Sequence, residues 1–595
     1  MTLPGRYGAG LAPFKAIQGD TLTIKLLRGG INISKAPEEL EEGESTNAID
    51  VRLHDGGVSS DFGLTALGTA FPTPPAWAAS TVYALGTLIK DTNSNIQRVT
   101  TAGTSGGAQP VWNVNPGGTT ADNTVTWTNS GLADPTILHL AEFEKKVSTG
   151  VKLVRMRTGG WDRWDGTSWL TLPMAAGLGL SNINTDRIYT VAKQDRLVAA
   201  NKVNQLLSWD GTDAGTVQAL SADAPVAWFI SPIGQRLFAA RVKIGASVDP
   251  YAVAWSTDGD ITNWTSSALG AGSGTLEPEV RGGPDFIMGV SGSETGLVIY
   301  RQRSIMFGLR TGVGASPFVF YTSVYGLGTE APYTVKNIGE TVGDIFLGHD
   351  LSVYLYSGKG SPTILSDPIR LSLISQIQDP SLCVGEVDRR NWEYWLLIKQ
   401  SATLPILAWV LSLKELLVNK RISWRQRQLP AGYSTAVWAR TATQSNPVVN
   451  SVNIIVNTIA TRVNDYGLSI SPSRVILGDG VGGASYSDET KFLATGNWES
   501  KILGKNERYT GLDRVYIVCQ SPTGATVEVS ISNDGGQTWT LPKSITVTAG
   551  RYAQAFGTWF DIVTQRWQYR LRILSGQVTI SEIRANIYDR GPVPT

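Results

Sequence analysis

A repeat of about forty-five residues constrains the fold of this chain more than any other feature of its sequence. The tetrapeptide WDGT at Trp164–Thr167 returns 45 positions later at Trp209–Thr212, and Trp255–Gly259 follows 46 positions further on. A short apolar run typical of a β-strand precedes each tryptophan. A strand-containing repeat of roughly 40–50 residues is typical of a β-propeller blade. Because one such sheet cannot bury both of its faces alone, neighbouring repeats are expected to stack.

Six hairpins carry the repeat, and they begin near residues 151, 196, 236, 296, 344 and 391, in steps of 45, 40, 60, 48 and 47. Their paired runs are 151–156 with 161–164, 196–200 with 205–209, 236–241 with 251–255, 296–300 with 304–309, 344–348 with 351–356, and 391–398 with 405–411. The sequence therefore predicts an all-β chain with a propeller of about six blades. Short helical turns are expected only at 37–42 and 367–377.

The Asp-Gly pair within each WDG sequence is interpreted as a turn. Asp165 and Asp210 are expected to accept hydrogen bonds from the backbone that follows them, as aspartates do in Asx turns. Gly166 and Gly211 are free to take the positive φ that a tight turn requires. Trp164, Trp209 and Trp255 are then expected at equivalent positions of successive blades.

Four regions are predicted. Residues 1–70 form an N-terminal segment that completes the propeller or faces a neighbouring protein, and 135–430 hold the blades. Residues 71–134 are low in charge, open with three prolines and break the blade spacing, so they are interpreted as an inserted small β-module. Residues 431–595 read as a C-terminal β-region.

Composition excludes several classes of function. Lys+Arg number 51 and Asp+Glu 50 in 595 residues, so the net charge of +1 gives no global attraction to nucleic acid or anionic membrane. Two cysteines in no ligand spacing, expected to be buried free thiols, and three scattered histidines predict no metal and no cofactor. The apolar stretch at 405–413 is too short to span a membrane, and Met1–Gly8 lacks a signal-like apolar region, so synthesis in a cytoplasm is expected.

The module carries four aromatic residues that are candidates for glycan binding. Trp77, Tyr83, Trp112 and Trp127 stand on a polar, glycine-rich background. Flat rings of this kind offer a face on which a sugar can stack. A domain of this size also needs aromatic residues for its own core, and both interpretations remain open.

Two further patterns have a possible chemical role. Ser532, Asp534, Gly536 and Trp539 match an Asp-box (S-x-D-x-G-x-x-W), a hairpin turn known from sialidase-like propellers and structural in most proteins that have it. The arginine triad and tyrosine nucleophile of a sialidase cannot be located, and no other hydrolase motif is evident, so the chain is expected not to be an enzyme. The basic run Lys420–Arg427 is interpreted as the solvated face of a strand, with phosphate contact as the alternative.

Several stretches together resemble the tail nozzle (distal tail tubular) proteins of short-tailed double-stranded DNA phages. They are 29–32 with 37–47, 51–58, 251–264, 497–501 and 589–591. Trp77, 83–86, 102–106, 110–112 and 124–128 make residues 71–134 similar to carbohydrate-binding-type modules that decorate virion proteins. The nozzle resemblance implies a homohexameric tube section in the virion tail, assembled in the host cytoplasm, and it brings no catalytic residues.

The same resemblance implies the partners of the chain. They are further copies of itself, a tail adaptor ring that the N-terminal region would face, tail fibre or tip proteins, and double-stranded DNA passing through the channel. Host-surface glycan is a further candidate. The leading hypothesis is thus a structural nozzle that retains and then conducts DNA. A glycan-binding β-propeller, either lectin or adhesin, is the alternative, and a sialidase-like glycoside hydrolase is the second.

Overall fold

The computed structural model describes residues 20–25, 27–54, 57–68, 74–115, 118–132, 136–146, 151–175, 178, 187–265, 270–277, 283–293, 296–313, 317–398, 406–429, 433–439, 474–479, 485–492, 496–504 and 508–592. The chain divides into two compact units, and each is considered by itself. Unit 1 contains residues Met1–Asp61, Ser423–Arg425 and Phe492–Thr595, and unit 2 contains Phe62–Ile422 and Gln426–Lys491.

Unit 2 repeats one antiparallel sheet in which the main strands follow one another in chain order. The first sheet contains β13 (Ile137–Phe143), β14 (Lys152–Arg157), β15 (Gly160–Trp164) and β16 (Trp169–Thr171). The second contains β17 (Tyr189–Lys193), β18 (Arg196–Ala200), β19 (Leu207–Trp209) and β20 (Gln218–Ala219). The third contains β21 (Ala227–Ile233), β22 (Arg236–Ile244), β24 (Ala252–Trp255) and β25 (Gly272–Thr275), with β23 (Ser247–Val248) beside β22.

The same order continues along the chain. The fourth sheet contains β26 (Ile287–Gly292), β27 (Gly296–Arg301), β28 (Ser304–Arg310) and β29 (Phe318–Tyr325). The fifth contains β30 (Lys336–Gly339), β31 (Gly343–Leu347), β32 (Val353–Tyr356) and β33 (Thr363–Ile364). Next come β34 (Val384–Asp388), β35 (Glu393–Leu397), β36 (Ile406–Ser412) and β37 (Trp424–Leu429). The connecting helices are η1 (Pro332–Thr334), η2 (Asp367–Ile369), α1 (Arg370–Gln376), η3 (Pro380–Leu382) and α2 (Leu413–Leu417).

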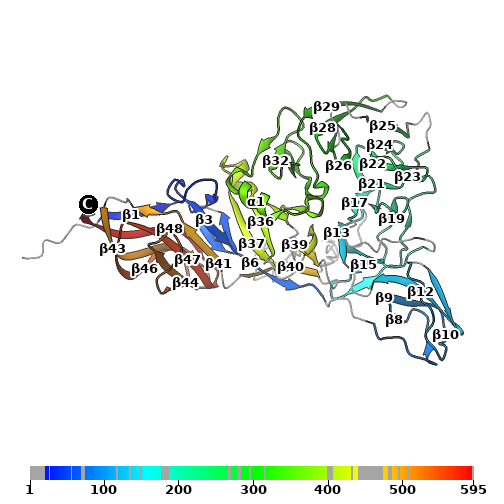
Figure 1. Ribbon diagram of the computed structural model, residues 1–595, viewed down its shortest axis with the longest axis horizontal. Helices are drawn as coiled ribbons and strands as arrows, with labels where there is room; N and C mark the ends of the chain where they lie inside the picture. The colour runs from blue at the N-terminus through cyan, green and yellow to red at the C-terminus, as the bar shows by residue number, and fades with distance from the viewer. Residues whose placement is uncertain are drawn as a thin grey trace, which may run out of the picture. The chain divides into compact units, whose positions relative to one another are not determined.

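One further sheet of unit 2 joins strands that are far apart in the sequence. It has the order β38 (Tyr433–Ala439), β39 (Arg474–Asp479), β40 (Ser485–Phe492) and β6 (Phe62–Ala66). Its first strand, β38, lies against both β34 and β13. β13 contacts β17, β17 contacts β21, and β21 contacts β26. Figure 1 shows the sheets following one another around a common centre, from β15 through β19, β24, β28 and β32 to β36.

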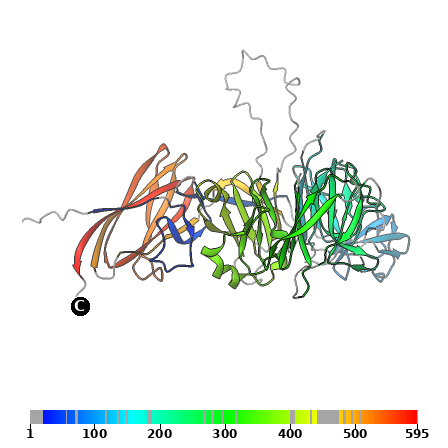
Figure 2. The ribbon, with the colours of Figure 1, turned by 90° about the horizontal axis from the view of Figure 1, so that it is seen from above.

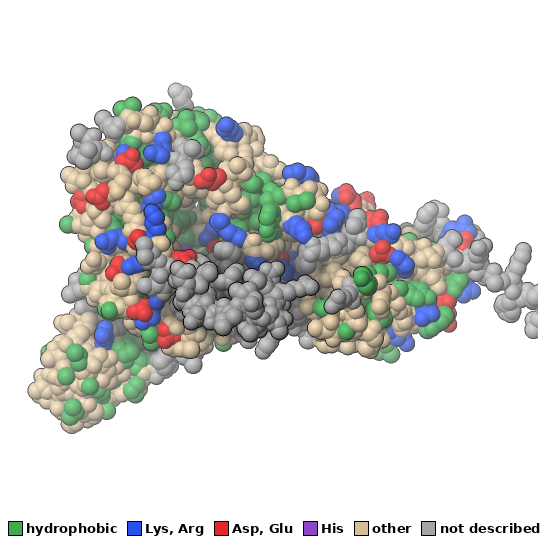
Figure 3. Space-filling model, turned by 180° about the vertical axis from the view of Figure 1, so that it is seen from behind, with side chains coloured by type: hydrophobic (Ala, Val, Ile, Leu, Met, Phe, Trp, Pro, Cys, Tyr) green, Lys and Arg blue, Asp and Glu red, His purple; other side chains and the backbone are tan. Residues whose placement is uncertain are grey.

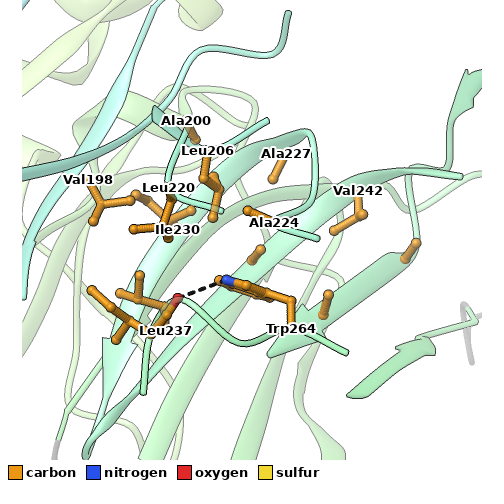
Figure 4. Close-up of a cluster of buried hydrophobic side chains, with 14 residues drawn as sticks. Val198, Ala200, Leu206, Leu220, Ala224, Ala227, Ile230, Leu237, Val242 and Trp264 are labelled. Carbon is orange, nitrogen blue, oxygen red and sulfur yellow. Dashed lines mark hydrogen bonds between the residues drawn. The ribbon is translucent and has the colours of Figure 1, made fainter. Parts of the chain in front are cut away.

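Packing between neighbouring sheets explains why the predicted runs are apolar throughout instead of alternating. In β18, Val198 and Ala200 pack toward the third sheet, whereas Leu197 and Ala199 pack toward the first. A strand buried on both faces needs apolar side chains at every position. Figure 4 shows the cluster between the second and third sheets, where the Trp264 indole donates to the Ile261 carbonyl at 2.8 Å.

The structure confirms the all-β prediction and the six hairpins. Each predicted pair is an antiparallel pair of the second and third strands of a sheet. Trp164, Trp209 and Trp255 each end the third strand of their sheet, as the repeat predicts. The helical turn expected at 367–377 is present as η2 and α1.

The inserted module also belongs to unit 2 and contains two small sheets. One pairs β7 (Val82–Tyr83) with β10 (Gly103–Thr104). The other has the order β11 (Thr119–Asp122), β12 (Val125–Leu132), β9 (Asn95–Thr101) and β8 (Leu88–Lys90). Residues 71–73, 116–117 and 133–134 of the predicted insertion lie outside the described residues.

Unit 1 is built from strands of both ends of the chain. One sheet has the order β4 (Val51–His54), β5 (Gly57–Ser60), β48 (Thr579–Pro592), β43 (Arg508–Ser521) and β46 (Gly550–Thr564), with β1 (Asp20–Lys25) beside β48. The other has the order β3 (Glu44–Ile49), β41 (Gly496–Ser500), β47 (Arg566–Gly576), β44 (Ala525–Ser532) and β45 (Lys543–Val547), with β2 (Gly30–Ile31) beside β3 and β42 (Leu503–Gly504) beside β47. Figure 2 shows these orange and red strands as long neighbours.

Three expectations differ from the structure. Residues 37–42 contain turns but no helix. The boundary expected at 430/431 is displaced, because β38–β40 join β6 in unit 2 and residues from Phe492 onward join the N-terminal segment in unit 1. The expectation that the basic run is a solvated face is wrong for Arg425 and Arg427, which are 3% and 0% exposed. Arg425 donates to the buried Asp61 carboxylate at 2.5 Å, and the Arg427 guanidinium lies 5.0 Å from the ring centre of Trp395.

Because sheet packing carries the stability of unit 2, removing one large buried ring should be costly. Trp209 is 0% exposed and packs between the first and second sheets, with its ring 6.0 Å from that of Phe143. We expect Trp209→Ala to lower the free energy of unfolding by about 3–5 kcal/mol. Urea titration followed by circular dichroism measures this loss. Trp392→Ala is the matched control, because Trp392 is 50% exposed; equal losses in the two variants would contradict the packing argument.

Candidate functional site

The four aromatic residues of the module come together, but mainly as its core. Trp127, Trp112 and Tyr83 are 0%, 5% and 7% exposed, and the Trp127 ring lies 4.7 Å from Tyr83 and 5.8 Å from Trp112. Trp77 packs against this cluster and is only partly buried. The indoles of Trp77 and Trp127 both donate to the Asp122 carboxylate, at 2.8 and 3.1 Å. The three buried rings therefore offer no free face to a sugar, and the candidate glycan surface reduces to Trp77.

The Asp-box-like residues form the hairpin turn between β44 and β45. Gly536 donates its N–H to the Ser532 hydroxyl at 2.8 Å, and Thr538 donates its N–H to the Asp534 carboxylate at 2.9 Å. The Trp539 indole donates to the Gly536 carbonyl at 3.1 Å. The hydrogen bonds from Thr538 and Ser532 lower the pKa of Asp534 to about 2. Every polar group of the motif is thus engaged in holding the turn.

The WDG aspartates have the same role. Asp165 accepts hydrogen bonds from the backbone N–H groups of Thr167 and Ser168, at 2.8 and 2.7 Å. These hydrogen bonds hold the pKa of the Asp165 carboxyl well below its usual range. Asp210 accepts from the backbone N–H of Thr212 at 3.0 Å. Gly166 and Gly211 have φ values of +105° and +75°, as the turn interpretation requires.

Sequence reasoning missed a pocket that lies among the first strands of the sheets of unit 2. This axial pocket has a volume of about 320 Å³ and is lined from β13, β17, β34 and β38 and from the segment around η1 and β30. Ligand pockets in proteins typically measure roughly 300–1,000 Å³. Its walls combine apolar residues with ionisable ones, which are His139, Glu142, Arg187, Tyr189, Tyr333, Lys336 and Glu386.

Charged and aromatic groups occupy distinct parts of the axial pocket. The Lys336 ammonium lies 2.8 Å from a carboxylate oxygen of Glu386, across two neighbouring first strands. The rings of Tyr189 and Tyr333 lie 5.3 Å apart, and the Tyr189 hydroxyl donates to the Pro332 carbonyl. Burial raises the pKa of the Tyr189 hydroxyl, so this group is a neutral donor.

His139 is held neutral in the same pocket. Its Nε2 lies 2.8 Å from the Thr190 hydroxyl. Desolvation, followed by the positive charges of Lys336 and Arg187, lowers its pKa to about 3. The pocket thus offers a neutral imidazole, two carboxylates, two cations and two phenol rings. This set can hydrogen-bond hydroxyl groups and stack on a flat ring.

The described residues contain no group of three or more His, Cys, Asp or Glu side chains placed to hold a metal ion. Cys383 and Cys519 are buried free thiols, as predicted. Within the part of the chain that the structure describes, no helix is long and apolar enough to cross a membrane. The residues of the axial pocket gave no sequence motif, because the pocket is formed by short strands up to 300 positions apart.

No family model and no curated protein matches the chain. Among solved structures, it is similar to an exo-β-1,3-galactanase from Phanerochaete chrysosporium at 7% identity and a TM-score of 0.24, covering 71% of this chain and 100% of that one. A glycoside hydrolase family 43 arabinoxylan arabinofuranohydrolase from Bacillus subtilis matches at 9% identity and a TM-score of 0.19, covering 86% and 97%. A family two carbohydrate esterase from Cellvibrio japonicus matches at 18% identity and a TM-score of 0.12; 17% of this chain covers 28% of it.

The three solved structures named above are all of carbohydrate-active enzymes, and the expectation that this chain is not an enzyme is withdrawn. Their TM-scores lie below 0.5, so no substrate and no catalytic residue is carried over from them. None of the three is a tail nozzle protein.

The desolvated imidazole of His139 predicts a pH dependence of stability. The pKa of His139 is about 3 in the folded chain against 6.5 in an unfolded one, so the unfolded state binds more protons between these values. Stability should therefore fall as the pH decreases below about 6.5, by up to about 1.4 kcal/mol per pH unit from this residue. We expect His139→Gln, whose amide can still bond Thr190, to flatten that slope. Urea titrations at a series of pH values test this; parallel curves for the two proteins would contradict it.

Proposed function

We propose that this chain is a glycan-binding β-propeller protein whose axial pocket receives a sugar. The observation that carries the proposal is the pocket itself, in which Tyr189 and Tyr333 stand beside Glu142, Glu386 and Lys336. Phenol rings can pack against the apolar face of a sugar. Carboxylates and an ammonium group can hydrogen-bond its hydroxyls. Such a combination of ring faces and a few polar groups is typical of small-molecule pockets.

We propose further that seven sheets close the propeller ring. Hydrophobic clusters join the first sheet to the second, the second to the third, the third to the fourth and the fourth to the fifth. One more cluster joins the β34–β37 strands to β38. Another joins β38, together with the residue that follows β6, to the first sheet. β6, which comes from the N-terminal part of the chain, is a strand of the last sheet and so joins the two ends of the ring. The pocket lies among the first strands of the sheets.

Truncating a ring of the pocket should weaken glycan binding. We expect Tyr333→Ala to raise the dissociation constant of a bound oligosaccharide about tenfold, which is about 1.4 kcal/mol. The ligand is selected on a glycan array, and the constants are then measured by calorimetry. Tyr321→Ala is the control, because Tyr321 is 44% exposed on β29 and does not line the pocket. Equal affinities of Tyr333→Ala and wild type would exclude the axial pocket as the binding site.

The same preparation distinguishes a lectin from a hydrolase. If the bound glycan is cleaved, then Glu142 and Glu386 are the carboxylates placed to act on it, because both line the pocket. Glu142→Gln and Glu386→Gln should then abolish turnover of a fluorogenic glycoside while leaving its binding measurable. Binding without turnover by the wild-type chain identifies a lectin.

A structural role in a phage tail nozzle is the second candidate, and the assembly of unit 1 favours it. The stretches that resemble nozzle proteins at the two ends of the chain pair with each other, since Asn47 of β3 lies opposite Glu499 of β41. Asp589 of β48 lies opposite Thr510 of β43 in the same unit. The stretches that resemble nozzle proteins thus lie in unit 1, except for the stretch at 251–264, which contains β24 of the third sheet of unit 2. Self-association, an adaptor ring, fibre proteins and DNA passage belong to this proposal.

The nozzle candidate predicts a ring of six copies. We expect the purified chain, alone or with an adaptor ring, to form closed hexamers, because heterologous contacts around one axis close without a cofactor. Negative-stain microscopy and native mass spectrometry measure the copy number. A monomer that stays monomeric with the adaptor, or a ring of another size, would remove this candidate and leave the glycan-binding proposal unchanged.

A further inference from the structure

Two cations are gathered around one indole beside the axial pocket. This rim cluster consists of Lys202, Trp228, Arg241, Phe286 and Tyr333. The Arg241 guanidinium lies 3.7 Å from the ring centre of Trp228 and 5.8 Å from that of Phe286. The Lys202 ammonium lies 4.5 Å from the ring centre of Trp228 and 5.9 Å from that of Tyr333. Tyr333 also lines the axial pocket, so the rim cluster and the pocket share a wall.

The fold places these residues at one end of the first strands. Trp228 is the second residue of β21, Phe286 immediately precedes β26, and Tyr333 lies in η1 just before β30. Ala227 pairs with Val242 and Phe229 with Ala240, so Trp228 and Arg241 face each other across β21 and β22. Opposed side chains on one face of an antiparallel pair are in contact. The rim cluster is therefore set by strand register.

Arg241 has a strained backbone conformation, and no anion among the described residues pairs with it. Its φ of +55° lies in the left-handed region that residues with a side chain rarely adopt. Among the described residues no carboxylate pairs with it; its Nε is buried without a hydrogen-bond partner, and its Nη1 contacts only the Met288 sulfur at 3.8 Å. Desolvation by burial lowers its pKa. Strained backbone and unsatisfied cations occur preferentially where a ligand completes the site.

We infer that the rim cluster binds the carboxylate of an acidic sugar, so that the glycan received by the axial pocket contains uronic or sialic acid residues. This inference rests on the proposed glycan-binding function and specifies its ligand. A guanidinium offers paired N–H donors that match the two oxygens of a carboxylate. Trp228 and Tyr333 supply ring faces for the sugar that carries it. Arg187 and Lys336 are further cations of the adjoining pocket, where Lys336 is paired with Glu386.

The experiment uses matched pairs of acidic and neutral ligands. Oligomers of galacturonate, alginate, hyaluronan and polysialic acid are each compared with their carboxyl-reduced forms, which keep the sugar chain and lose the charge. Dissociation constants of the full chain are measured by calorimetry at low and high salt. We expect wild type to bind at least one acidic oligomer about tenfold or more tightly than its reduced form, and high salt to diminish that preference.

Variants then assign the preference to the rim cluster. Arg241→Gly is the main variant, because glycine adopts a φ of +55° without strain and the fold should be kept. It should bind the acidic and the reduced oligomer equally, and Lys202→Met should lose part of the preference. Arg389→Met is the matched control, since Arg389 is an exposed arginine of unit 2 outside the pocket lining. It should behave as wild type.

The outcomes separate the inference from the proposed function. If neutral glycans bind as tightly as acidic ones and Tyr333→Ala abolishes both, the axial pocket is a glycan site and the acidic-sugar inference is wrong. If Arg241→Gly keeps the full acidic preference, the rim cluster is not the carboxylate site. If no glycan of either kind binds the wild-type chain, both proposals are overturned together.

Discussion

The face-to-face packing of small sheets is the interaction on which unit 2 depends. The second sheet has two apolar faces, and each is covered by a neighbouring sheet, as β18 illustrates with Leu197 on one side and Val198 on the other. Fully burying one such side chain contributes roughly 1.5–3 kcal/mol. Such clusters join the first five sheets in order, and another joins β13 to β38 at the opposite end of the repeat. The first strands are thereby brought around the pocket that no single sheet could form.

The local part of this arrangement was predictable, and the long-range part was not. The second and third strands of each sheet form hairpins with apolar runs and turn residues, so Asp165 and Gly166 could be interpreted from sequence alone. The first strands contain charged and polar residues where they line the pocket, such as His139 and Glu142, which breaks the pattern. β6 joins β40 across more than 400 residues, and no local signal encodes that pairing.

Burial decides the role of the aromatic and basic residues that the sequence singles out. Trp112 and Trp127 have the composition of a sugar platform, but a module of this size has few other large side chains with which to fill its interior. The local sequence around Arg425 is typical of the solvated face of a strand. In the structure the side chain is paired with Asp61, which lies 364 positions away in the sequence. Buried charges must be paired because their desolvation is expensive. The sequence therefore identifies these aromatic and basic residues as candidates for binding, whereas the side chains that surround them determine whether they bind a ligand or stabilise the fold.

The near-zero net charge conceals local differences in how charged side chains are compensated. The chain carries +1 overall, and Figure 3 shows acidic and basic side chains interspersed over the face in view. Most buried arginines are compensated, as Arg155 and Arg157 are by Asp162 at 2.8 and 3.0 Å. Arg241 differs, because it stacks on Trp228 with no carboxylate partner among the described residues and is held in a strained conformation. A left-handed non-glycine residue costs roughly 1–3 kcal/mol. The stability of the fold does not explain why this cost is retained. A gain in the free energy of ligand binding would offset it.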